Sequence, residues 1–75
     1  MELCDVNTGD RVRIKRLNAD ASIRRRLLDI GLIPGTEVEC VAIGPQGDPL
    51  AFCVRGAVIA IRKCDCKKIS VEHGR

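Results

Sequence analysis

Short runs in which charged and aliphatic residues alternate constrain the fold of this chain more than any other feature. The clearest run covers residues 11–15 and alternates strictly, with Val12 and Ile14 as its aliphatic members. A period of two places successive side chains on opposite faces of a strand, so Val12 and Ile14 are expected to point inward. Leu17 interrupts the alternation, which predicts either a bulge or the end of the strand.

Similar short runs recur along the rest of the chain, and glycine or proline separates them. The strand candidates cover residues 36–43, 50–54, 57–62 and 69–71. Leu50, Phe52 and Val54 share one face of their run, as expected for a strand with one buried face. Pro34-Gly35 precedes the first of these runs and fits a type II turn, because proline fixes a negative φ and glycine tolerates a positive one.

The segment between the first two strand candidates has a helical period instead. Ile23, Leu27 and Ile30 recur at intervals of four and three residues, which places them on one side of a helix. Three arginines, at positions 24–26, occupy the other side. The possible N-caps are Asn18, Asp20 and Ser22. Gly31 fits the position after the helix, where the chain needs a positive φ.

A chain of 75 residues is expected to form a single domain, residues 1–75. Closing or nearly closing a sheet hides strand edges around an aliphatic interior. The predicted fold is therefore mainly β: a small barrel of about five strands with one α-helix between the first and second strands. Phe52 is the only aromatic residue and the net charge is only +3, so nucleic-acid binding is not expected.

The stretch that joins the expected helix to the next strand carries a family signature. Residues 25–38, RRLLDIGLIPGTEV, resemble the helix-to-strand signature of the FeoA family. Residues 47–50, GDPL, and 54–56, VRG, are similar to two further elements of that family, in the same order and spacing. The resemblance covers nearly the whole chain, from about residue 3 to residue 71.

The resemblance implies an SH3-like barrel. It also implies a cytosolic protein that associates with FeoB, the membrane ferrous-iron permease with a GTP-binding domain, and assists Fe²⁺ uptake. The same fold forms the C-terminal domain of iron-dependent repressors of the diphtheria-toxin-repressor type, but no DNA-binding domain is expected in this protein. The sequence shows neither a signal peptide nor a membrane span, so a cytoplasmic location and no membrane insertion are expected.

Basic residues of the helix and an apolar pair after it form the predicted contact surface for the permease. The residues concerned are Arg24, Arg25, Leu28, Leu32 and Ile33. An exposed aliphatic pair beside cations is typical of a protein-docking patch. The alternatives are that the arginines form a solvated helix face and that Leu32 and Ile33 cover the open end of the barrel.

Cysteine content raises a second hypothesis, a stand-alone metal-binding or metal-sensing module. Cys64, Cys66 and His73 could hold Fe²⁺ or another transition metal, since thiolate and imidazole suit such ions. The alternative is that cysteines pack as small hydrophobic residues, as Cys40 is expected to do, and the family usually has a small residue such as alanine at the position of Cys66.

Catalytic motifs are not found. The sequence contains no phosphate-binding G-x-x-x-x-G-K-[ST] loop. The single histidine, His73, falls in residues 72–75, which are expected to form a loose tail. An enzyme is therefore not predicted, and a small basic barrel that binds nucleic acid is the weakest alternative.

Overall fold

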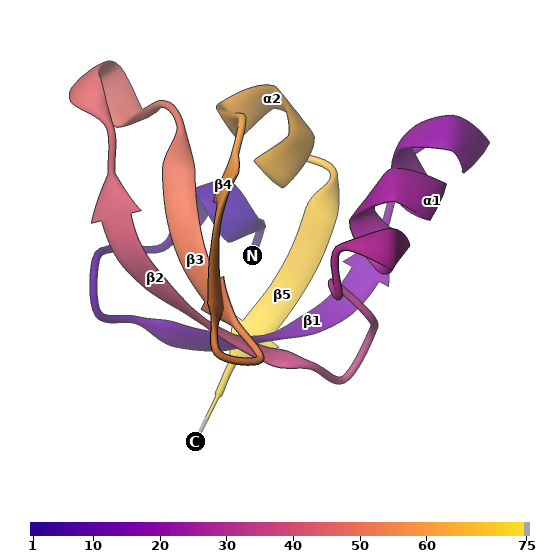
Figure 1. Cartoon of the computed structure of the whole chain (residues 1–75), viewed down its shortest axis with the longest axis horizontal. Helices are drawn as coiled ribbons and strands as arrows, with labels where there is room; N and C mark the ends of the chain where they lie inside the picture. Colours follow the sequence, from indigo (N-terminus) through magenta and orange to yellow (C-terminus); the bar gives the residue numbers. More distant parts are fainter. Residues whose placement is uncertain (75) are drawn as a thin grey trace.

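The computed structural model describes residues 1–74 and contains one antiparallel sheet of five strands, wrapped around an apolar interior (Figure 1). The strands are β1 (Arg11–Leu17), β2 (Glu37–Ile43), β3 (Leu50–Val54), β4 (Ala57–Ile61) and β5 (Ile69–His73). Their order in the sheet is β4-β3-β2-β1-β5, so the two outer strands do not pair and the barrel stays open between them. This confirms the prediction of a mainly β fold.

The helices lie in the connections between strands. The main helix α1 (Ala21–Asp29) joins β1 to β2, and the single-turn helix α2 (Lys63–Cys66) joins β4 to β5. Two 3₁₀ turns, η1 (Leu3–Asp5) and η2 (Pro45–Gly47), complete the structure. Figure 1 shows α2 at one end of the molecule, and β5 ends at the opposite end.

Residues close together in the sequence determine where α1 begins and how the chain turns after it. Asp20 is the N-cap among the three candidates, because its Oδ1 accepts a hydrogen bond from the Ile23 N–H at 3.2 Å. Gly31 has the expected positive φ, +104°, and turns the chain after the helix. The Thr36 N–H then donates to the Ile33 carbonyl at 2.9 Å, which closes the predicted turn at Pro34-Gly35.

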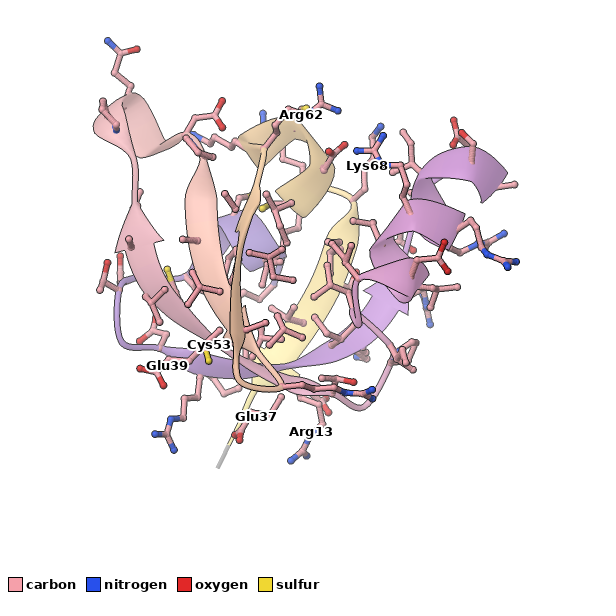
Figure 2. All side chains as sticks on the ribbon, in the orientation of Figure 1. Arg13, Glu37, Glu39, Cys53, Arg62 and Lys68 are labelled. Atoms are coloured by element: carbon pink, nitrogen blue, oxygen red, sulfur yellow. The ribbon has the colours of Figure 1, made fainter. Side chains whose placement is uncertain are left out.

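The core contains aliphatic side chains, two cysteines and Phe52, as the low aromatic content requires (Figure 2). Val12, Ile14, Phe52 and Cys40 are all buried, in agreement with the period-two pattern. Ala42, two positions after Cys40, is nevertheless exposed, because the register with β3 shifts between these two residues.

The two ends of the chain are more ordered than the sequence predicts. Leu3 is fully buried in η1, and the Met1 carbonyl accepts a hydrogen bond from the Val71 N–H at 2.8 Å. The expected loose tail is wrong for residues 72 and 73, since β5 continues to His73, which pairs with Val12 of β1. Arg75, the last residue of that predicted tail, lies outside the described residues. Among residues 1–74 the model contains no helix with the length and hydrophobicity needed to span a bilayer.

Candidate docking site

A groove between β1 and α1 brings basic and apolar side chains together. Its cavity volume is about 290 Å³. The lining residues are Lys15, Arg16, Leu17, Arg24, Leu28 and Pro34. We call these six residues, together with the exposed Ile33, the docking face. Leu17 is almost fully buried and Leu28 partly buried, so the groove has an apolar floor with cations at its rim.

The cations of the docking face are available to a ligand. Lys15, Arg16 and Arg24 are exposed, and within residues 1–74 none of them forms an ion pair with an acidic side chain. Exposed, unpaired cations beside apolar surface can contact an acidic partner without first breaking an internal interaction. The face therefore has the composition of a protein contact rather than of a catalytic cleft.

Sequence reasoning found only part of this face. Arg24 and Leu28 line the groove, and the nearby Ile33 is 39% exposed, while their contact with a partner stays a prediction. Arg25 is exposed too, but its Nε lies 3.3 Å from Asp29 Oδ1, so its charge is already paired. Lys15 was not predicted as part of this surface, because it is one of several charged residues that alternate with aliphatic residues in the same strand.

The position of Arg16 on the same face depends on a bulge. The register between β1 and β5 shifts between Ile14 and Arg16, and the consecutive residues Lys15 and Arg16 are both exposed. In a regular strand one of two neighbouring side chains would point toward the core. The interruption at Leu17 was the only sequence signal for this bulge.

The prediction that Leu32 belongs to an exposed docking patch is wrong. Its side chain has no exposed surface, and its N–H donates to the Leu27 carbonyl at 3.0 Å. The positive φ of Gly31 turns the chain back toward the sheet, so the next side chain enters the core. Leu32 therefore packs in the core beneath α1. Of the predicted exposed pair, only Ile33 lies at the surface.

The three residues predicted to hold a metal ion are not brought together. Cys64 is exposed on α2, whereas His73 is the last residue of β5, at the opposite end of that strand (Figure 1). Cys66 is fully buried, and its thiol donates to the Ile61 carbonyl at 3.8 Å. Within residues 1–74 no three His, Cys, Asp or Glu side chains are grouped as metal ligands. Binding through these three residues would require a rearrangement of the fold.

Burial also keeps two of the thiols protonated. Loss of solvent around Cys66 raises the pKa of its thiol to about 12, and burial likewise raises the pKa of Cys40. Since the thiolate is the form that binds metals and attacks electrophiles, Cys66 is not prepared for either role at neutral pH. The burial and the raised pKa both agree with the alternative that Cys66 packs in the core as a small hydrophobic residue.

Two carboxylates accept hydrogen bonds at the end of the barrel near α2, where Figure 2 shows Arg62. Asp65 is the buried charged residue of the described chain, and its Oδ2 accepts a hydrogen bond from Arg62 Nη2 at 3.2 Å. Oδ1 of Asp48 accepts a hydrogen bond from the Lys63 N–H at 2.9 Å and caps the first turn of α2.

Comparison with known proteins agrees with this geometry. The sequence model of the FeoA domain matches residues 1–73. The chain belongs to the FeoA family. The resemblance found in the helix-to-strand signature is thereby confirmed for nearly the full length of the chain.

One curated relative is a Fe²⁺ transport protein A/Fe²⁺ transporter FeoB fusion protein from Porphyromonas gingivalis. It is 31% identical over 72 residues, which are 96% of this chain but only 8% of the relative. In that protein the FeoA-like part and the transporter belong to a single polypeptide.

Solved FeoA structures have the same SH3-like fold. Iron(II) transport protein A from Clostridium thermocellum superposes with a TM-score of 0.92 at 34% identity, covering 97% of this chain and 45% of that one. A FeoA of Stenotrophomonas maltophilia, an SH3 domain protein solved with zinc, gives a TM-score of 0.79 at 32% identity, covering 96% and 89%. These likenesses confirm the predicted fold class.

Proposed function

We propose that this chain is a non-catalytic, cytoplasmic accessory module of ferrous-iron uptake that binds a FeoB-like membrane permease through the docking face. Fe²⁺ is then the cargo of the permease rather than a cofactor of this domain. The observation that carries the proposal is the groove in which Lys15, Arg16 and Arg24 surround the apolar floor of Leu17 and Leu28.

The physical argument concerns both attraction and contact. Unpaired cations at the rim steer an acidic surface of the permease toward the groove, and their effect weakens as salt increases. The half-buried Leu28 and the exposed Ile33 then offer apolar area that loses water on contact. The fused relative supports this reading, because a covalent link keeps two associating parts at a high effective concentration.

The proposal can be tested by Fe²⁺ uptake in cells. A strain that lacks the native copy would receive either the wild-type chain or the double variant Arg24→Glu/Ile33→Ser. Both substituted side chains are exposed, so we expect the variant to fold normally. Uptake of labelled Fe²⁺ should fall to the level of the strain that lacks the protein.

The matched control is Arg55→Glu, which reverses an exposed charge on the β3–β4 turn, a residue that does not line the docking groove. It should support normal uptake. Normal uptake with the double variant, at equal protein level, would refute the proposed surface.

A further inference from the structure

One edge of the sheet is open, whereas the other is covered. At the β5 edge the Val71 N–H donates to the Met1 carbonyl, and Glu2 forms a bridge with Ser70. The other outer strand, β4, pairs with β3 alone. Proteins usually protect an open edge with charges, proline or a bulge. β4 has the sequence AVIAI and a regular register with β3, so it has none of these protections.

The turn into β4 determines which backbone groups face outward. Arg55 and Gly56 form a two-residue turn with φ values of +51° and +84°, and Val54 pairs with Ala57. Such a turn makes its flanking residues a hydrogen-bonded pair, and pairs then alternate along the ladder. Val58 and Ala60 therefore direct their N–H and C=O groups away from β3. Within residues 1–74 no other backbone hydrogen bond involves them.

A groove with a volume of about 340 Å³ lies between β4 and α1. The wall formed by α1 contains Arg26, Leu27 and Ile30, and the opposite wall contains Ile59, Ala60 and Ile61, with Arg62 and Asp65 at the end. Ile30 is 42% exposed and Ile59 partly exposed, so apolar pockets lie next to the unpaired backbone groups. Arg26 and Ile30 lie on the side of α1 opposite to Arg24 and Leu28, and no residue lines both grooves, so this groove is separate from the docking face.

The charge of the groove favours an acidic ligand. Arg26 is exposed and, within residues 1–74, has no ion pair. The one carboxylate in the lining, Asp65, is 4% exposed and already accepts hydrogen bonds from Arg62. A bound segment would therefore meet arginine guanidinium groups rather than free carboxylates.

We propose that the β4–α1 groove binds an extended, acidic segment of a partner protein, which adds to the sheet as a strand beside β4. The backbone of the segment pairs with Val58 and Ala60, its apolar side chains contact Ile30 and Ile59, and a carboxylate contacts Arg26. This is strand addition, a common mode of peptide recognition at open sheet edges.

A single segment fits this place better than a second copy of the chain. The groove has α1 as its opposite wall, so an incoming strand must lie between a helix and the sheet edge. The open strand of a second copy carries β3 of its own sheet beside it, so the groove would have to accommodate a second strand next to α1. A single extended peptide has no second strand attached to it, so it can lie between β4 and α1.

The test is a titration of the ¹⁵N-labelled full chain with a short synthetic peptide that alternates valine with aspartate. We expect saturable shifts of the Val58 and Ala60 amide signals and slower hydrogen exchange at these two amides. A peptide with lysine in place of aspartate should bind at least about fivefold more weakly, and Arg26→Glu should weaken the aspartate peptide by a similar factor. Arg25→Glu, on the same helix but outside the groove, is the matched control and should bind normally.

Two changes test the backbone pairing itself. Ala60→Pro removes one outward N–H without removing a β3–β4 hydrogen bond, and it should lower the affinity at least about fivefold. If that variant does not fold, the same peptide with N-methylated amides at alternate positions, added to the wild-type chain, should fail to bind.

The proposal is overturned if the N-methylated peptide binds as well as the unmodified one, or if the lysine peptide binds equally well. It is also overturned if the Val58 and Ala60 signals shift with protein concentration alone, because a second copy would then occupy the edge.

Discussion

Cysteine residues show how one residue type takes different roles according to its surroundings. Cys40 and Cys66 have no exposed surface, whereas Cys64, two positions from Cys66, is exposed. The spacing of Cys64 and Cys66 suggested a metal site, but on the single turn of α2 residues two positions apart point in nearly opposite directions, so one thiol is in the core and the other in water. Spacing alone could not distinguish these outcomes, because they depend on how α2 packs against the core.

Replacing Cys66 with alanine tests the burial of its thiol through the pH dependence of stability. In the unfolded chain this thiol loses its proton near its ordinary pKa of 9.0, but in the folded chain only near a pKa of about 12. Above pH 9 the unfolded state therefore binds fewer protons, and the free energy of unfolding falls as the pH rises.

Urea denaturation of both proteins at several pH values measures this effect. Near neutral pH we expect Cys66→Ala to be less stable, since it leaves a small cavity. Above pH 9 the stability advantage of the wild type should shrink by about 1.4 kcal/mol per pH unit. An advantage that stays constant up to pH 11 would show that the thiol is not buried in solution.

Among the elements, those with local signals were predicted and those with distant partners were not. The strands, the Asp20 cap of α1 and the turn at Pro34-Gly35 follow from residues within a few positions of one another. The connection that contains α2 showed no helical period in the sequence. The cap of α2 comes from Asp48, fifteen positions earlier in the chain, so no local pattern could reveal it.

The substitution Asp48→Ala tests this distant cap. It leaves the Lys63 N–H without its acceptor, and the loss of a helix cap typically costs about 1 kcal/mol of stability. Urea denaturation should detect the decrease, and Asp48→Asn should recover most of it because the amide oxygen can accept the same hydrogen bond. Asp29→Ala removes an exposed ion pair on α1 and should change stability by less than about 0.5 kcal/mol. Equal stability of Asp48→Ala and Asp29→Ala would contradict the capping role.

At the scale of the whole molecule, sequence and structure agree on the fold and only partly on the site. The alternating runs predicted a curled sheet, but not which strand would remain open, since strand order depends on contacts between distant residues. The arginines of α1 could be read from the helical period. Lys15 and Arg16 could not be joined to them, because only the bulge in β1 and the packing of α1 bring these cations together.

Direct binding to the permease is the measurement that tests the central claim. Calorimetric titration of this chain into the purified cytoplasmic part of a FeoB-like permease from the same cell should show saturable binding that weakens as salt increases. Arg24→Glu should lower the affinity at least about fivefold, while Arg55→Glu should leave it unchanged. Equal affinity of the wild type and Arg24→Glu, or no binding of the wild type at low salt, would contradict the account.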